Sequence, residues 1–213
     1  MNSIIVLDFS GTLTHEEIAQ EASNRRFKFL GQKVNQKWLK RALANNDHYQ
    51  LNKKLISRQT GLKDDRELTI IMTDLFKYFT LQVVNQRKNK AFQPGIIAVL
   101  KKLKKQGYSL AVVSGTRTDI IKNVFKITGH EKLIDYIFGQ PPELGFSNEQ
   151  LLACCARHGR IAYIVGDKLT DLVPAKKYRA KTIFVTWGHP LGQEKQTADF
   201  TISQPKGLLK IIK

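Results

Sequence analysis

The chain has 213 residues, 42% of them hydrophobic, which suits one large domain or one domain with a modest insertion. Lysine and arginine together number 35 against 18 acidic residues, and the net charge of +17 favours anionic partners, such as phosphate esters or nucleic acid, over cationic ones. A membrane-spanning helix needs about 18 consecutive apolar residues, and the sequence contains no such run, so a membrane span is not expected.

The chain contains two cysteines, Cys154 and Cys155, which are adjacent in a predicted helix. Neighbouring helix positions point in different directions, so a disulfide framework is excluded. The N-terminal stretch MNSIIVLDF does not match a secretory signal, because its apolar run is short and Asp8 follows at once. We therefore expect reduced thiols and a cytoplasmic protein.

The first predicted element is a buried strand over Ile4–Leu7, where four β-forming residues stand in a row. This strand delivers Asp8 to a loop that continues with Ser10, Gly11 and Thr12. A carboxylate at the end of a buried strand is a candidate for chemistry, although an aspartate can also simply cap a turn.

The next part of the chain, residues 15–92, shows helical periodicity and no predicted strand. Thr14 and Glu17 have the spacing of a capping box that opens a helix. The periodicity predicts three helices, over residues 15–30, 36–44 and 66–84. Residues 85–95 are expected to form a polar linker. We interpret residues 15–92 as a helical cap inserted between the first and second strands of a sheet.

The remaining strands are predicted from short β-branched runs at residues 109–113, 134–138, 161–165, 182–186 and 200–202. Helical segments lie between most of these strands. The segment 95–106 places its lysines opposite an apolar face, and Ser147 with Gln150 forms a predicted capping box at the start of another helix. The alternation predicts an α/β fold with a doubly wound parallel sheet, built from residues 1–14 and 93–213.

Polar residues follow three of the predicted strands. Asp8 follows the first strand, Ser114 and Gly115 follow the second, and Asp167 and Asp171 follow the fourth. In a doubly wound sheet the carboxyl ends of the strands beside the switch in strand order meet, so these residues should lie together. Carboxylates with few nitrogen ligands suit Mg²⁺, and a hydroxyl with exposed amides suits a phosphate. The dipole of a helix could also explain an acid at position 171.

The order and spacing of these motifs resemble the haloacid dehalogenase superfamily, most of whose members are Mg²⁺-dependent phosphatases. VLDFSGTLT resembles the first motif of that family, VVSGT the second and VGDKLTD the fourth, across nearly the whole chain. The insertion lies where members of the family carry a helical cap. The resemblance implies that Asp8 attacks phosphorus in a phosphorylated small molecule, forming an aspartyl-phosphate.

The resemblance also implies how the other motif residues act. Phosphate would be bound by residues that follow the first and second strands, Thr12, Ser114 and Gly115. Mg²⁺ would be held by Asp8, Asp167 and Asp171, together with the backbone carbonyl of Ser10.

Two positions depart from the family pattern. The first motif normally contains a second aspartate, which protonates the leaving group and later activates water, and here Ser10 stands in its place. The third motif normally supplies a lysine, but the stretch 143–148 reads ELGFSN. Lys168, next to Asp167, is one candidate for the missing positive charge, and a basic residue of the cap is another.

These observations leave two classes of function. The first is an enzyme, a Mg²⁺-dependent phosphatase or phosphotransferase that works through Asp8. The second is a catalytically inactive or impaired binding module that retains the fold and binds an anionic partner, such as nucleic acid or a protein. The intact acids favour the enzyme, whereas Ser10 and the missing lysine favour the module. The sequence alone names no substrate and no oligomeric state.

Overall fold

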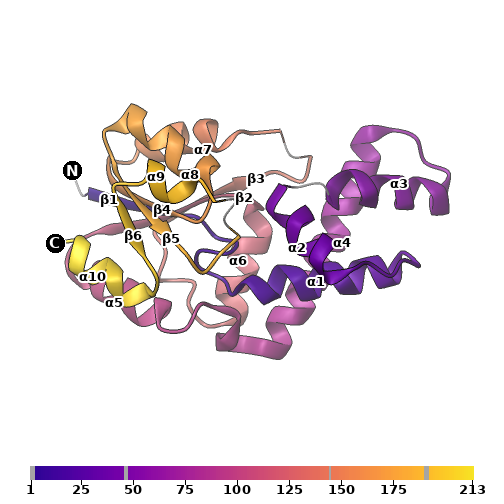
Figure 1. The fold of residues 1–213 in the computed structure, drawn as a ribbon, viewed down its shortest axis with the longest axis horizontal. Coiled ribbons are helices and arrows are strands. Elements are labelled where there is room, and N and C mark those ends of the chain that lie inside the picture. The colour runs from indigo at the N-terminus through magenta and orange to yellow at the C-terminus, as the bar shows by residue number, and fades with distance from the viewer. Residues whose placement is uncertain (1–2, 46–47, 144, 190–191) are drawn as a thin grey trace.

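A computed structural model describes residues 3–45, 48–143, 145–189 and 192–213. Its centre is a six-stranded sheet in which every neighbouring pair is parallel, in the order β3-β2-β1-β4-β5-β6 (Figure 1). The strands are β1 (Ser3–Leu7), β2 (Ser109–Arg117), β3 (Tyr136–Gln140), β4 (Arg160–Gly166), β5 (Lys181–Val185) and β6 (Phe200–Ile202). The predicted doubly wound α/β fold is therefore confirmed.

The helices connect the strands and form the insertion. The α-helices are α1 (Glu16–Phe29), α2 (Gln36–Asn45), α3 (His48–Thr60), α4 (Asp65–Arg87), α5 (Ile96–Lys105), α6 (Thr118–Ile127), α7 (Asn148–Ala156), α8 (Leu169–Leu172), α9 (Glu194–Thr197) and α10 (Leu208–Ile211). Short 3₁₀ helices are η1 (Lys88–Ala91), η2 (Val173–Tyr178) and η3 (Pro205–Gly207). The strand order reverses at β1, which pairs with β2 on one side and with β4 on the other. The carboxyl ends of these three strands therefore meet at the place where such sheets bind ligands.

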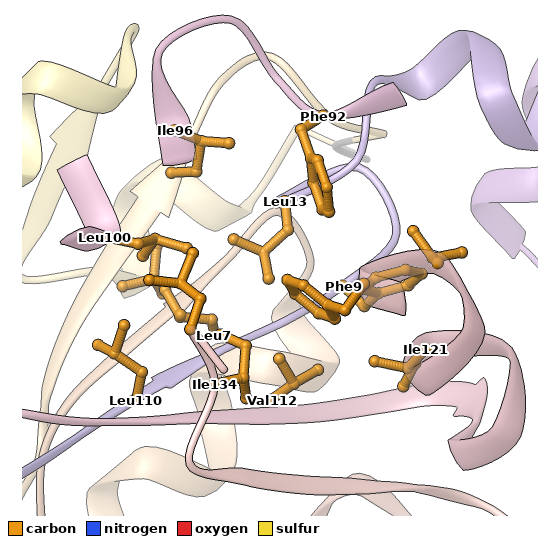
Figure 2. Close-up of a cluster of buried hydrophobic side chains, with 14 of the residues drawn as sticks. Leu7, Phe9, Leu13, Phe92, Ile96, Leu100, Leu110, Val112, Ile121 and Ile134 are labelled. Atoms are coloured by element: carbon orange, nitrogen blue, oxygen red, sulfur yellow. The ribbon is translucent and has the colours of Figure 1, made fainter. Parts of the chain in front are cut away.

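The two faces of the sheet bury separate apolar clusters because side chains alternate along a strand. Ile5 and Leu7 of β1 face the larger cluster, which includes residues of α5, α6 and α10 (Figure 2). Ile4 and Val6 face the other cluster, which α7 covers with Leu152 and Cys155. Helices therefore cover both faces of the sheet, and the carboxyl ends of the central strands are where sheets of this kind bind ligands.

Helices α1 to α4 form a group beside the sheet (Figure 1), and no described residue of 15–92 belongs to a named strand. The chain leaves and returns at one place, because His15 N donates to Ala91 O and Gln93 N donates to Leu13 O, both at 2.8 Å. The group has an apolar cluster of its own, with Phe27, Leu39 and Met72 among its members. We propose that residues 15–92 form the cap and residues 1–14 and 93–213 the core.

The exit from the insertion differs from its prediction. Helix α4 continues to Arg87, and η1 follows directly, so residues 85–91 are not an irregular linker. Val83 and Val84 are buried in the main apolar cluster, and Arg87 forms ion pairs with Glu17 at 2.7 Å and Glu21 at 2.8 Å. These tertiary contacts stabilise the last turn of the helix in a polar stretch, where the periodicity of the sequence had predicted that the helix ends.

Two further expectations for the insertion were wrong or incomplete. The capping box of Thr14 and Glu17 does not form, because the Thr14 hydroxyl donates to Phe9 O and His15 Nδ1 accepts from Glu17 N instead. Helix α3 was not predicted, since its sequence is largely polar. It is held by Leu55 and Ile56, which are buried in the cluster of the insertion.

The strand limits differ from the predicted ones by a few residues. Strand β2 extends beyond 109–113 to Arg117, with an irregularity in its pairing to β3 between Val113 and Arg117. Strand β3 begins at Tyr136, two residues later than predicted, and Ile134 before it is buried in the main cluster. Among the described residues, none of the helices has the length and apolar character needed to cross a membrane.

Packing of α5 against the sheet provides a test of this architecture. Leu100 is fully buried in the main cluster (Figure 2), whereas Lys101 is exposed on the same helix. We expect Leu100→Ala to lower the free energy of unfolding by about 3 kcal/mol, since it removes buried methyl groups and leaves a cavity. Lys101→Ala should change it by less than about 0.5 kcal/mol. Urea denaturation of both variants measures the difference, and equal stabilities would contradict the assigned faces of α5.

Candidate active site

Asp8 lies directly after β1, at the point where the strand order reverses. Its backbone N–H donates to Val165 O on β4 at 2.9 Å, which continues the sheet pairing by one residue. Its side chain is buried, and the Ser114 hydroxyl on β2 donates to Asp8 Oδ1 at 2.9 Å. The carboxylate is therefore fixed between the ends of the three central strands.

Two more carboxylates lie beside Asp8. Carboxylate oxygens of Asp8, Asp167 and Asp171 lie within 4.8 Å of one another, and all three residues are buried. Asp167 follows β4 directly, and Asp171 is one turn further, in α8. These three acids therefore lie together at the carboxyl ends of the strands, as the sequence predicted.

Hydrogen bonds orient the two acids of this cluster that follow β4. Asp167 accepts from the Thr12 hydroxyl at 3.3 Å and from the backbone N–H of His189 at 2.6 Å. Asp171 accepts from Asn148 Nδ2 at 3.0 Å and from the backbone N–H of Lys168 at 3.1 Å. Both carboxylates therefore accept charge-assisted hydrogen bonds that restrict their rotation.

Glycines allow Asp167 to approach the backbone closely. A Cβ atom added to Gly11 would lie 2.6 Å from Asp167 Oδ2, and the φ angle of Gly11 is +89°. A Cβ atom at Gly188 would also collide with the Asp167 carboxylate. The carboxylate is held between two backbone segments at positions that no other residue type can occupy without displacement.

Burial and mutual repulsion make this cluster costly without a cation. Burial, followed by the charge of Asp167, raises the pKa of Asp8 to about 7, although hydrogen bonds from Phe9 N–H and Ser114 and the charge of Lys168 oppose the shift. Burial and the charges of Asp8 and Asp167 also raise the pKa of Asp171. Three close oxygen donors with excess negative charge fit a hard divalent cation such as Mg²⁺.

The cluster opens into a cavity of about 760 Å³. Most of the residues selected from the sequence line it: Asp8, Ser10, Ser114, Gly115, Lys168 and Asp171. Thr12 and Asp167 are fully buried and are not lining residues. The opposite wall comes from the insertion and is largely apolar, with Ala19, Leu43, Tyr49 and Phe76.

Lys168 connects the core side of the cavity with the insertion. Its ammonium donates to Leu43 O in α2 at 3.3 Å, and its charge lowers the pKa of Asp8. In the stretch 143–148, where the family lysine was expected, Asn148 binds Asp171 instead. Lys168 is therefore a cation within electrostatic reach of Asp8 on the described part of the chain.

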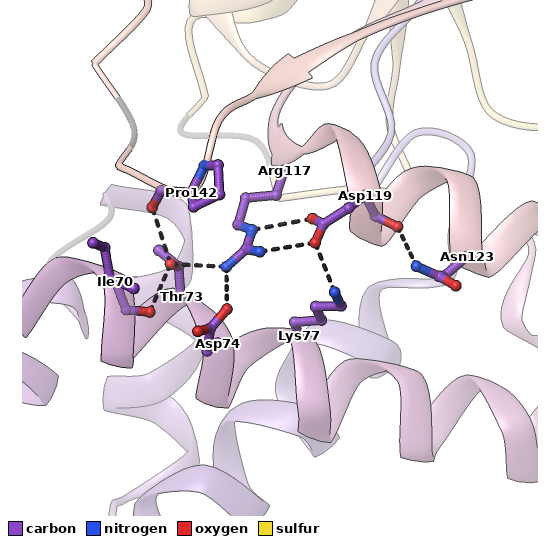
Figure 3. Close-up of polar contacts among 8 residues, drawn as sticks. All are labelled: Ile70, Thr73, Asp74, Lys77, Arg117, Asp119, Asn123 and Pro142. Carbon is purple, nitrogen blue, oxygen red and sulfur yellow. Dashed lines mark hydrogen bonds and ion pairs between the residues drawn. The ribbon is translucent and has the colours of Figure 1, made fainter.

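Sequence reasoning missed Arg117, which lines the cavity three residues after Ser114. Its Nη1 pairs with Asp74 of α4 at 2.6 Å, and its Nη2 pairs with Asp119 of α6 at 2.8 Å (Figure 3). Lys77 of α4 also binds Asp119, at 2.7 Å. An arginine directly after the second motif was the available signal, but its partners lie in the insertion and could not be read from the sequence.

His189 is a second cavity residue that was not among the candidates selected from the sequence. It is buried, lines the cavity, and its ring nitrogens have no hydrogen-bond partner among the described residues. Burial lowers its pKa. The preceding residues hold this loop against the first motif, since Trp187 Nε1 donates to Thr12 O at 3.1 Å.

Comparison with known proteins gives relatives in sequence and in structure. A phosphoglycolate phosphatase of Aquifex aeolicus is 30% identical over 124 residues, which cover 56% of this chain and 58% of that protein. The fold is shared with a predicted phosphatase from Clostridium acetobutylicum, at a TM-score of 0.74 and 18% identity over 100% of this chain and 98% of that one. The fold is also shared with CbbY from Rhodobacter sphaeroides, solved in complex with phosphate. The TM-score is 0.71 and the identity 17%, over 98% of this chain and 96% of that one.

The family model of haloacid dehalogenase-like hydrolases matches residues 5–185, a range that contains the first, second and fourth motifs and the insertion. The match thus covers the three strand ends that carry the carboxylates and the cavity between the sheet and helices α1 to α4. On this evidence, the chain belongs to the haloacid dehalogenase-like hydrolase family.

Proposed function

We propose that this protein is a Mg²⁺-dependent phosphohydrolase in which Asp8 is the nucleophile. The observation that carries the proposal is the buried cluster of Asp8, Asp167 and Asp171 at the end of the cavity. A sequence relative that is named a phosphatase supports the same type of reaction. The binding-module alternative receives no comparable support.

In the proposed first step, a carboxylate oxygen of Asp8 attacks phosphorus and the bond from phosphorus to the ester oxygen breaks. The Ser114 hydroxyl donates to Asp8 Oδ1, and its single O–H would turn to a phosphoryl oxygen instead once the substrate is bound. Gly115 leaves the adjacent backbone open to the cavity. Lys168 provides positive charge near Asp8, which favours the reactive carboxylate over its protonated form.

The proposed metal ligands are Asp8, Asp167, Asp171 and the backbone carbonyl of Ser10. A bound Mg²⁺ would neutralise negative charge on the transferring phosphoryl group and on the three carboxylates. Thr12 and His189 N–H keep Asp167 oriented for this role.

In the proposed second step, water attacks the aspartyl-phosphate, the bond between phosphorus and Asp8 breaks, and inorganic phosphate leaves. Water must lose a proton in this step, and an alkoxide leaving group must gain one in the first. Ser10 lies where the family has the aspartate that moves these protons, and a hydroxyl group is a poor acid and base near neutral pH. Slow breakdown of the intermediate follows.

We also propose a reducing compartment such as the cytoplasm, because Cys154 is a free, exposed thiol beside the buried Cys155. The net charge of +17 keeps nucleic acid as a further anionic partner to be tested.

The identity of residue 10 predicts a preference for activated substrates. General acid–base catalysis contributes about 10²–10⁴-fold, and aryl or acyl phosphates depart without needing a proton. We expect the wild type to hydrolyse an aryl phosphate faster than an alkyl phosphate. We expect Ser10→Asp to raise turnover by about 10-fold or more, chiefly for the alkyl ester.

Steady-state assays of both proteins on both esters measure this preference, with Asp8→Asn as the blank. Efficient alkyl phosphate hydrolysis by the wild type would show that another residue moves the proton. Activity no higher than the blank in both proteins, together with salt-sensitive nucleic-acid binding, would favour the binding module.

The metal assignment predicts that Asp167→Asn weakens Mg²⁺ binding by at least about 10-fold while the protein stays folded, because the variant loses one charged oxygen ligand. Asp199→Asn is the matched control, since Asp199 accepts from Thr182 away from the cluster. Calorimetric titration with Mg²⁺ measures both affinities. Equal affinities in the wild type and Asp167→Asn would remove Asp167 from the site.

The raised pKa of Asp8 predicts a pH-dependent stability in the absence of metal. The folded carboxyl titrates near 7 and an unfolded one near about 4, so the folded state retains a proton that the unfolded state has lost between these values. This group therefore lowers the free energy of unfolding as pH rises through that window. In EDTA, the free energy of unfolding of Asp8→Asn minus that of the wild type should be roughly 2 kcal/mol larger at about pH 7 than at about pH 5. Urea denaturation at both pH values would contradict the shift if the difference stayed constant.

A further inference from the structure

The insertion contains an arginine that is buried and has no acidic partner among the residues that the structure describes. Arg26 of α1 is fully buried, and its Nε and Nη1 have no hydrogen-bond partner among the described residues. Its one hydrogen bond on the described part of the chain is from Nη2 to the Ser23 hydroxyl, at 3.4 Å. A guanidinium has five N–H donors, so most of its hydrogen-bonding capacity is unused.

The acids nearest in sequence do not compensate this charge. They are engaged by other cations in the ion pairs Glu16–Lys40, Glu17–Arg87 and Glu21–Arg25. Burial lowers the pKa of Arg26 to about 10, and Tyr49 is the neighbour that opposes this shift. Packing on the rings of Phe27 and Phe76, at 5.6 Å and 5.2 Å from the guanidinium carbon, replaces only part of the lost hydration.

The guanidinium lies directly behind the apolar wall of the cavity. Two of its neighbours, Phe76 and Tyr49, line that wall. Ala19, which also lines it, is on the same face of α1 as Ser23 and Arg26. Side chains of a helix point toward its N-terminus, and the bond to Ser23 directs the guanidinium back along α1 toward Ala19.

The other long cations at the cavity already have partners. Arg117 is paired with Asp74 and Asp119, and Lys168 donates to Leu43 O and acts on Asp8. A charge inside a desolvated wall acts over several ångströms, so an anion in the cavity would interact with Arg26 across the edges of Phe76 and Tyr49.

We propose that Arg26 is a specificity-determining residue that favours substrates with a second anionic group, a carboxylate or a phosphate, at the end distant from the phosphoryl group that reacts. This proposal rests on the proposed function for the position of the reacting phosphate at Asp8. The second anion would lie against the wall of Ala19, Tyr49 and Phe76 and supply a counter-charge that Arg26 does not receive from the described residues.

The test compares ligands that differ only in this charge. Calorimetry on the Asp8→Asn protein with Mg²⁺ measures binding of 4-carboxyphenyl phosphate, its uncharged isostere 4-carbamoylphenyl phosphate, and hydroquinone bisphosphate; the 3-substituted isomers test a shorter reach. We expect at least one charged ligand to bind about 10-fold or more tightly than the amide of the same geometry. The charged ligand that binds more tightly than the amide, the carboxylate or the bisphosphate, identifies the chemical class of the second anionic group. No preference in any geometry overturns the proposal, and this comparison needs no change at Arg26.

Variants then assign the preference to the residue. Arg26→Met should abolish the preference, and Arg26→Lys should keep part of it. Lys28→Met, which removes one positive charge from the exposed side of the same helix, should keep all of it. Retention of the full preference in Arg26→Met overturns the proposal. Because binding is measured without turnover, hydrolysis by the wild type is a separate result: its absence would defeat the proposed function, while a charge preference that depends on Arg26 would still stand.

Discussion

Repulsion among three buried carboxylates is the constraint on which the rest of the site depends. Asp8, Asp167 and Asp171 are brought together because the sheet reverses its order at β1, and the nearby Lys168 offsets only part of their charge. The fold offers donors from Ser114, Thr12 and backbone amides, yet the pKa of Asp8 stays raised. The protein thus retains an arrangement that costs stability when empty, as expected where selection acts on a site rather than on the fold alone.

The insertion is tied to this site by the residues that leave the central strands. Arg117, at the end of β2, reaches Asp74 in α4 (Figure 3), and Lys168, after β4, reaches Leu43 O in α2. The main apolar cluster also includes Phe79 and Val83 of α4. A displacement of the insertion would therefore disturb the contacts of Arg117 and Lys168 at the strand ends and the apolar cluster that the insertion shares with the sheet.

The sequence predicted features that depend on local patterns and missed those that depend on contacts between distant segments. The six strands and their parallel sheet, the acids at the strand ends and the capping box at Ser147 follow from periodicity and short spacings, and each is present. Helix α3 was missed because its polar sequence becomes helical only when Leu55 and Ile56 pack in the insertion. Arg26 looked like one base among many in a chain of +17. Only the fold shows that Arg26 is buried next to Phe76, which is fifty residues further along the chain.

The glycines around the carboxylates set how far the sequence of this site can drift. Gly11 and Gly188 enclose the Asp167 carboxylate, and a Cβ atom at Gly166 would lie 2.5 Å from Asp171 Cβ. A descendant that keeps the acids must also keep these three positions free of side chains, whereas one that loses the acids is released from that requirement. A related protein with side chains at the positions of Gly11, Gly166 and Gly188 could therefore not hold its carboxylates where this chain holds Asp167 and Asp171.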